Sequence, residues 1–408
     1  MQQARAIRTR GGRRRLRLPR LRAPSAGILL SLLVFLSPDL TLAPLNAGEP
    51  PQTRPTPIDL IGVGHPPPHV RPLDEPDPSP HVSRPRGDPV AYTAALDAAR
   101  AAASAHGISF AAVRDGNLLW SGASGRARDA TTGLSTDDPF VIGSVTKTFV
   151  AAAILQLVEE GRLELDDTLR SHLPELRGFD RAVTIRQLLD HTSGIADIFN
   201  DTTRRGLEDH PELAWSGADV LGSIHAPWYR PGEGWAYANT NYFLLGLIVE
   251  RITGSTLGDE LSRRFFEPVG LENTRLLTGA ADDGALLPPA WATIFWASGA
   301  MSAPAADLAR WGDSLYGGGV LEAASLTAME EVNDHDYGLG VQRIELADAV
   351  GFGHTGLLNT YTSLLWHIPD SNVTIALLVN RSHVDLGAVL TAHPNGGRSL
   401  LELVEELP

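Results

Sequence analysis

Ser144 and Lys147 are the two side chains of this sequence whose types and spacing best suit nucleophilic chemistry. They lie in the segment Gly143-Ser-Val-Thr-Lys147, directly before an apolar stretch with the spacing of a helix. Residues three apart share one face of a helix, so the amine would lie near the hydroxyl. A serine hydroxyl is a poor nucleophile until a base takes its proton, and a lysine whose pKa is lowered by burial can be that base. We therefore predict that Ser144 is a nucleophile activated by Lys147.

Lysine usage supports this prediction. Of the 34 basic residues in the sequence, 33 are arginine and one is lysine, and that lysine is Lys147. Arginine supplies a fixed positive charge, but its pKa is too high for it to accept a proton. A lysine at this position therefore indicates a need for an amine that can lose its proton. The alternative is that one lysine remains by chance in a lysine-poor composition.

Tyr237-Ala-Asn239 is a second motif with suitable side chains. A tyrosine phenol is normally protonated at neutral pH, and beside a lysine ammonium it could act as a proton shuttle. An asparagine amide offers both donors and an acceptor, so Asn239 could bridge Lys147 and a substrate amide. Without further context, a surface tyrosine is the alternative interpretation.

The third motif is Gly353-His-Thr-Gly356, at the entry to a predicted hairpin. A glycine on a strand lets another backbone approach closely, so a substrate could pair along this edge. The backbone N–H of Leu357 would be an oxyanion donor beside that of Ser144 at the helix N-terminus. His354 could supply a positive or hydrogen-bonding group facing Tyr237. A packed or surface histidine is the alternative.

Apolar patterning predicts the elements that must position these motifs. Apolar residues recur with helical spacing from Thr146 to Glu160, and Gly161 supplies a C-terminal stop. Two hairpins are predicted where apolar runs are joined by turn residues, and two further helices near the ends of the region. The hairpin strands cover 108–113 with 117–121 and 362–368 with 373–380, and the helices cover 91–105 and 399–407.

Strands at both ends of this region, with helices between them, predict an α+β fold. The end strands would pair into one antiparallel sheet flanked by helices. Residues from about 185 to 330 would form a separate, mostly helical lobe.

The first 88 residues differ in composition from the rest. Residues 1–47 contain nine arginines and the apolar run 26–36, which is too short to span a bilayer and suits a signal peptide. Residues 48–88 are dense in proline and predict an extended linker, which leaves 89–408 as the catalytic domain. We expect a secreted or periplasmic protein without a stable membrane span after processing. An uncleaved membrane anchor is the alternative.

Charge and composition exclude several other classes of function. The segment 1–47 carries a net charge of +8, which leaves −22 on the remainder because the whole chain carries −14. Such an acidic surface repels phosphates, so we expect no nucleic-acid partner. The sequence has no cysteine and no His-Glu-x-x-His segment, which excludes a thiol nucleophile and a zincin-type zinc site. We expect no metal and no cofactor.

Two other features look catalytic without supporting a site. Gly312-Asp-Ser-Leu315 spells a lipase-like signature, but it follows the helical stretch 305–311 deep in the chain. His191 precedes Thr-Ser-Gly194, where a structural role in a turn is the better interpretation. The Gly-x-Ser-x-Gly nucleophile elbow of α/β-hydrolases is absent from the sequence.

Taken together, the three motifs resemble those of class C β-lactamases and serine D-alanyl-D-alanine carboxypeptidases. The matching segments are Ser144-x-x-Lys147, Tyr237-x-Asn239, His354-Thr355-Gly356, 188–194, 241–250 and 298–302. The similarity covers nearly everything from residue 90 to the C-terminus. It implies a β-lactamase/transpeptidase-like fold.

The resemblance also implies an acyl-enzyme mechanism. Ser144 would attack a carbonyl, Lys147 and Tyr237 would move the protons, and Asn239 would orient the substrate. The backbone N–H groups of Ser144 and Leu357 would hold the oxyanion. The substrate site would include His354, Thr355 and Gly356. Water would then attack the ester, with Tyr237 as its base.

Two departures from the family pattern bear on the substrate. His354 stands where many β-lactamases have lysine, which favours the carboxypeptidases and related esterases over antibiotic hydrolysis. Asn359-Thr-Tyr361 replaces a common Pro-Gly-aromatic sequence. A β-lactamase proper and a catalytically silent peptidoglycan-binding protein remain alternatives. The expected substrate is an acyl ester, a β-lactam or a D-Ala-D-Ala peptide, held beside aromatic residues of the helical lobe. The candidate aromatic residues are Trp228, Tyr229, Phe295 and Trp296.

Overall fold

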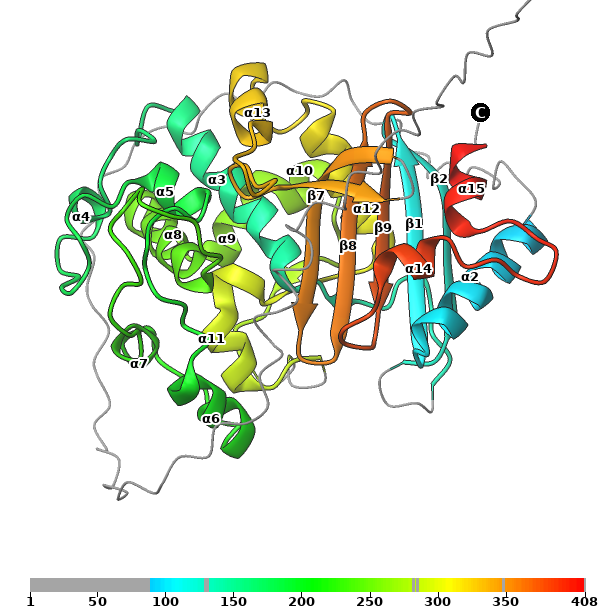
Figure 1. Cartoon of the computed structure of the whole chain (residues 1–408), viewed down its shortest axis with the longest axis horizontal. Coiled ribbons are helices and arrows are strands. Elements are labelled where there is room, and N and C mark those ends of the chain that lie inside the picture. Colours follow the sequence, from blue (N-terminus) through cyan, green and yellow to red (C-terminus); the bar gives the residue numbers. More distant parts are fainter. Residues whose placement is uncertain (1–88, 128–131, 281–282, 284–285, 347–348, 407–408) are drawn as a thin grey trace, which may run out of the picture. The chain divides into compact units, whose positions relative to one another are not determined.

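The computed structural model describes residues 89–406, apart from 128–131, 281–282, 284–285 and 347–348 (Figure 1). The predicted signal peptide at 1–47 and the predicted linker at 48–88 lie outside the described residues. Among the described residues, no helix combines the length and the apolar character that a membrane span requires.

A six-stranded antiparallel sheet joins the two ends of the described chain. Strand β1, near the beginning, pairs with β9, near the end, in a register that sets Ile108 opposite Val379. The strands, in spatial order, are β2 (Asn117–Gly125), β1 (Gly107–Arg114), β9 (Val373–Val379), β8 (Tyr361–Ile368), β7 (Ala349–Leu358) and β6 (Gln342–Leu346). This pairing confirms the predicted antiparallel sheet.

The predicted hairpins form where their turn residues indicated. Asp115 and Gly116, between β1 and β2, both have positive φ, at 50° and 75°, as a two-residue hairpin turn requires. The carboxylate of Asp313 accepts a hydrogen bond from the Gly116 N–H at 2.7 Å and holds this turn against a helix. In the second hairpin, Asn372 adopts φ 51° between β8 and β9.

Helices cover both faces of the sheet (Figure 1). On one face, α2 (Pro89–Ala103) packs with α14 (Leu386–Leu390) and α15 (Leu400–Glu405) over Phe110, Trp366 and their neighbours. On the other face, α12 (Ala305–Tyr316) packs against β1, β8 and β9. With both faces covered, β8 and β9 are buried along their whole length, which explains their unbroken apolar runs.

The other α-helices lie mostly on one side of the sheet (Figure 1). They are α3 (Thr146–Glu159), α4 (Leu169–His172), α5 (Ile185–Leu189), α6 (Asp201–Asp209), α7 (Gly217–Gly222), α8 (Asn239–Thr253), α9 (Leu257–Leu261), α10 (Glu267–Val269), α11 (Pro289–Gly299) and α13 (Ala323–Glu330). A small sheet of β3 (Phe140–Val141), β5 (Met301–Ala303) and β4 (Arg275–Leu276) accompanies them. The predicted helical lobe at 185–330 is wrong in one respect, because α12 lies within that range and packs on the main sheet.

Helix α3 is buried on almost every side. Eleven of its fourteen residues are buried, because it packs between α8, α9 and α11 while Phe149 stacks on Trp311 of α12 at 3.9 Å. Gly161 adopts φ 66° just after the helix, as the predicted stop requires. A one-turn 3₁₀ helix, Gly143–Val145, leads directly into α3 and contacts β7. The N-terminal end of α3 therefore lies where the helices meet the sheet.

Candidate active site

Ser144 and Lys147 are brought together as predicted. Ser144 lies in the 3₁₀ turn rather than in the α-helix itself, and Lys147 lies in the first turn of α3. The distance from Lys147 Nζ to Ser144 Oγ is 3.1 Å, which is hydrogen-bond distance. The spacing of three residues thus places amine and hydroxyl side by side.

The surroundings of Lys147 favour a neutral amine. Its side chain is fully buried, and Nζ donates to Asn239 Oδ1 at 2.9 Å and to the Ser298 carbonyl at 2.7 Å. Both of these oxygens can only accept, so they take the two hydrogens of a neutral amine and leave its lone pair for the Ser144 hydroxyl. Burial lowers the pKa of Lys147 to about 7, although the charge of Asp197 acts in the opposite direction. A large fraction of Lys147 is therefore unprotonated near neutral pH.

Tyr237 lies against the amine but is not poised as a base. The Nζ of Lys147 is 4.8 Å from the centre of the Tyr237 ring. The phenol oxygen is buried and has no partner in good hydrogen-bonding geometry among the described residues. Burial raises the pKa of Tyr237 far above its ordinary value, against the opposing effect of the Ser144 hydroxyl. The phenol therefore suits proton relay. It can accept a proton from water only if it gives its own proton to another group at the same time.

Asn239 and Ser298 complete the contacts of the lysine from two other helices. Asn239 is the first residue of α8, and its amide Nδ2 donates to Asp197 Oδ2 at 3.2 Å. Ser298 lies near the end of α11, two residues after an irregular backbone at Trp296 (φ 19°, ψ −108°). Three elements distant in sequence thus converge on one nitrogen atom.

The third motif places a backbone N–H beside Ser144. A Cβ at Gly143, whose φ is 53°, would come within 2.8 Å of the Leu357 nitrogen. A Cβ at Gly356 would come within 2.1 Å of the Ile142 carbonyl oxygen. Only glycine at both positions allows β7 to lie this close to the turn that carries Ser144. This geometry fits the predicted pair of oxyanion donors, the N–H groups of Ser144 and Leu357.

Of the two roles predicted for His354, a positive group or a hydrogen-bonding group, the structure favours the second. His354 is buried, and burial together with the charge of Lys147 lowers its pKa to about 3, so the imidazole is neutral. Its Nδ1 lies 2.6 Å from the Thr355 carbonyl and must donate there, so Nε2 accepts from the Tyr337 hydroxyl at 3.0 Å. The predicted facing partner, Tyr237, has its ring centre 6.3 Å away.

Both hydrogen-bond donors of Thr355 are bonded within the protein. Its N–H and its hydroxyl both donate to Gln342 Oε1 of β6, at 2.9 and 3.0 Å. Backbone pairing of β6 with β7 ends at Gly353, opposite Gln342. The edge available to a substrate therefore begins beyond Thr355, at Gly356 and Leu357.

Several residues at the site were missed by the sequence analysis. They are Asp197, Tyr337 and the backbone carbonyl of Ser298. Asp197 lies three residues beyond the segment 188–194 that resembles the family, and nothing in its local sequence marks it. A carbonyl carries no side-chain signal at all. His191 has the predicted structural role, since its Nδ1 accepts from the Ala238 N–H at 3.2 Å.

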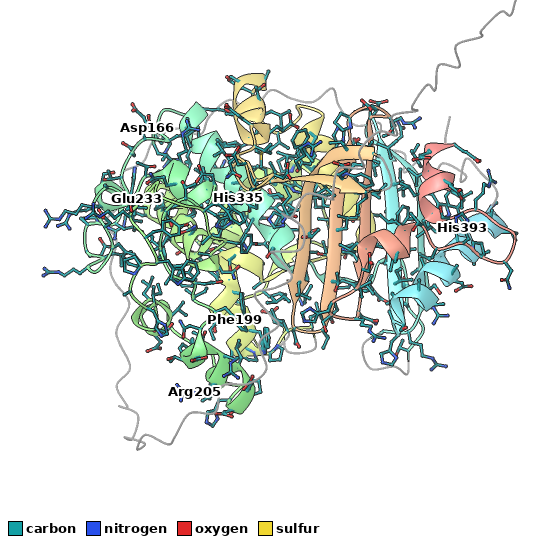
Figure 2. All side chains as sticks on the ribbon, in the orientation of Figure 1. Asp166, Phe199, Arg205, Glu233, His335 and His393 are labelled. Carbon is teal, nitrogen blue, oxygen red and sulfur yellow. The ribbon has the colours of Figure 1, made fainter. Side chains whose placement is uncertain are left out.

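The aromatic residues predicted to line the cleft separate into two groups. Phe295 is in the core and Trp296 packs edge-on against Phe243, whereas Trp228 is 52% exposed. A further aromatic pair lies near the site. Figure 2 shows His335 where the helices meet the sheet, and its ring stacks on that of Trp235 at 4.5 Å.

The lipase-like signature does not form a second catalytic centre. The Gly312–Leu315 signature lies inside α12, where Gly312 packs against Leu365. Its acidic residue, Asp313, holds the first hairpin turn. Within the described part of the chain, no cluster of three or more His, Asp or Glu side chains could hold a metal ion.

Comparisons with known proteins identify relatives of most of the chain. The family model described as Beta-lactamase matches residues 93–393. Penicillin-binding protein 4 of Amycolatopsis lactamdurans is 30% identical over 322 residues, which are 70% of this chain and 83% of that protein.

Solved structures agree with these matches. A D-stereospecific amidohydrolase from Streptomyces sp. is 30% identical with a TM-score of 0.65, covering 76% of this chain and 99% of that one. The D-amino acid amidase from Ochrobactrum anthropi SV3, in complex with L-phenylalanine, has a TM-score of 0.63 at 22% identity. That match covers 77% of this chain and 98% of the amidase, and it supports the fold alone.

Proposed function

This chain belongs to the β-lactamase family of serine hydrolases, and from that premise we propose that it cleaves an amide or ester carbonyl through an acyl-enzyme on Ser144. The observation that carries the proposal is the buried amine of Lys147, with two acceptors on its hydrogens and the Ser144 hydroxyl on its remaining position. A buried amine in this arrangement is a general base within reach of its nucleophile.

Acylation follows from this geometry. Lys147 takes the proton of Ser144 as Oγ bonds to the substrate carbonyl carbon, and the N–H groups of Ser144 and Leu357 stabilise the oxyanion. The bond to the leaving amine or alcohol then breaks, and the proton held by Lys147 reaches the leaving atom through the phenol of Tyr237. Hydrolysis of the ester follows the reverse route. A proton of the attacking water passes through Tyr237 to Lys147 as the water oxygen bonds to the carbonyl carbon, and Lys147 gives it to Ser144 Oγ as the ester bond breaks.

A neutral third motif favours substrates without a carboxylate beside the scissile bond. A lysine at position 354 would offer a positive charge to the carboxylate of a β-lactam or a D-Ala-D-Ala terminus, whereas His354 is uncharged and bonded to Tyr337. The likeness to a D-stereospecific amidohydrolase supports an amide substrate of D configuration. We therefore place small D-configured acyl amides and esters first, carboxypeptidase activity second and β-lactam hydrolysis third.

A substrate panel on purified protein tests this order. We expect the highest kcat/KM on D-alanine p-nitroanilide and small p-nitrophenyl esters. We expect kcat/KM to be lower by about tenfold or more on D-Ala-D-Ala peptides and nitrocefin. A factor of this size is the effect of one missing hydrogen bond to a charged group. The L-alanine anilide is the matched control for configuration.

Other outcomes identify the alternatives. Fastest turnover of nitrocefin would identify a β-lactamase proper, and fastest turnover of D-Ala-D-Ala peptides would identify a carboxypeptidase. If a fluorophosphonate or a fluorescent penicillin left Ser144 unlabelled, the silent peptidoglycan-binding protein would replace the enzyme. Export through the segment 1–47 stays a prediction, as does the absence of a nucleic-acid partner.

A further inference from the structure

A single loop, residues 191–197, holds the backbone of the second motif along its length. The His191 carbonyl accepts from the Ala236 N–H at 3.1 Å, and His191 Nδ1 accepts from the Ala238 N–H at 3.2 Å. Asp197 continues the row, because its Oδ1 accepts from the Asn239 N–H at 3.0 Å. These contacts place Tyr237 and Asn239 by fixing the backbone on either side of them.

Within the described part of the chain, Asp197 accepts hydrogen bonds only from N–H groups. Its Oδ1 also accepts from the Phe199 N–H at 3.2 Å, and its Oδ2 accepts from the side-chain amide of Asn239 at 3.2 Å. The carboxylate is buried, with 8% of the residue exposed. A buried carboxylate that accepts several N–H bonds is held in one orientation.

The contact with the side chain of Asn239 decides which end of that amide faces the lysine. Because Nδ2 is committed to Asp197, Oδ1 must point to the other side, where it accepts from Lys147 Nζ at 2.9 Å. We propose that Asp197 is a positioning residue for acylation, which orients the Asn239 amide and stabilises the charged form of Lys147. This inference rests on the proposed role of Lys147 as the base for Ser144.

Asp197 is the one ionised acid among the titratable groups that face Lys147 in the described structure. The others are His191, Tyr237, Tyr242 and His354, and each is neutral near pH 7 because burial lowers the pKa of the histidines and raises that of the tyrosines. The Asp197 carboxylate raises the pKa of Lys147, while burial raises the pKa of Asp197 itself to about 6. Above that pH the carboxylate retains the ammonium that acylation generates.

An amide at position 197 cannot replace the carboxylate. If its oxygen stayed on the Phe199 and Asn239 backbone donors, its NH₂ would face the NH₂ of Asn239. Asn239 would then turn its own oxygen toward residue 197 and its NH₂ toward Lys147. That NH₂ would donate to the lone pair of the amine, in competition with the Ser144 hydroxyl.

Asp197→Asn tests the inference through two readouts, the pH profile of kcat/KM and the titration of Lys147. We expect the plateau of kcat/KM on the best substrate to fall by about tenfold or more, within the range set by general-base catalysis. We also expect the acid limb of the profile and the midpoint of the Lys147 titration to move to lower pH, because the ammonium loses its carboxylate. The matched control is Asp307→Asn, another buried acid that accepts a backbone N–H, from Asn273, and whose partners are not residues of the site. The control is expected to lower stability without moving either midpoint.

The outcomes separate a positioning role from a structural one. A loss of activity in Asp197→Asn with an unmoved acid limb and an unmoved Lys147 titration would overturn the inference. Asp197→Ser provides a second uncharged variant with a smaller side chain, and it is expected to shift both midpoints in the same direction. If Ser144→Ala retained turnover, the proposed function itself would fail. If Ser144→Ala were inactive and both Asp197 variants behaved like the wild type, only the role of Asp197 would fail.

Discussion

Replacing Ser144 with alanine is expected to reduce kcat/KM by a factor on the order of 10⁴ to 10⁶, the loss seen when a serine hydrolase is deprived of its nucleophile. The proposed mechanism has no second nucleophile, because the covalent bond to the substrate forms at Ser144 Oγ. The fold should persist, because the hydroxyl interacts with Lys147 and Tyr237 within the site. Steady-state kinetics with the best substrate of the panel measures the loss, and thermal unfolding reports on the fold.

Ser302→Ala is the matched control for this variant. Ser302 is a buried serine on β5, and its hydroxyl has no hydrogen-bond partner among the described residues. Its removal is expected to leave kcat/KM within about twofold of the wild type, because it leaves no partner unsatisfied. Turnover by Ser144→Ala at a rate comparable with this control would exclude Ser144 as the nucleophile.

Lys147→Arg is expected to be nearly as damaging, with a loss in kcat/KM of about 10³ to 10⁴, although the positive charge is kept. A guanidinium stays protonated throughout the accessible pH range, so it cannot take the proton of Ser144. The site is also fully buried, and the larger planar group would have to displace Asn239 or the Ser298 carbonyl. Kinetics and labelling of Ser144 by a fluorophosphonate measure both acylation and turnover.

Two further variants distinguish the loss of the base from the general effect of exchanging lysine and arginine. Arg162→Lys, just beyond the end of α3 with 39% of its side chain exposed, exchanges the same two residue types where no proton is transferred, and it should be fully active. Lys147→Met keeps most of the length of the side chain without an amine, and it should be as inactive as Lys147→Arg. Near-normal rates in Lys147→Arg would contradict the proposed base.

The local parts of the fold were predictable from sequence because local chemistry determines them. Asp115-Gly116 provides two residues that tolerate positive φ, and this is what the turn between β1 and β2 requires. Helix α3 was recognisable from apolar spacing and from Gly161. The position of α12 was not predictable, because an amphipathic helix does not indicate which of several apolar surfaces it will cover.

The residues of the site also separate into those that local sequence indicated and those that depend on the folded structure. The spacing of Ser144 and Lys147 on one turn indicated their contact, and the resemblance to a family indicated Tyr237 and Asn239. Asp197 was not identified because its importance arises from the two N–H donors of Asn239, the backbone one and the side-chain one, which folding brings to it. The sequence left open whether His354 is charged, because its burial, and hence its pKa, depends on the packing of Tyr337 and β7 around it.

Titration of the Lys147 side chain by NMR tests the central claim most directly. The sequence contains no second lysine, so protein labelled with [6-¹³C]lysine should give one side-chain signal. The pKa of Lys147, lowered to about 7 by burial, predicts a midpoint near pH 7, with kcat/KM rising through the same pH range as the free amine forms. A midpoint above about pH 10, in the ordinary range of an exposed lysine, would show that the amine is protonated at neutral pH and cannot be the base for Ser144.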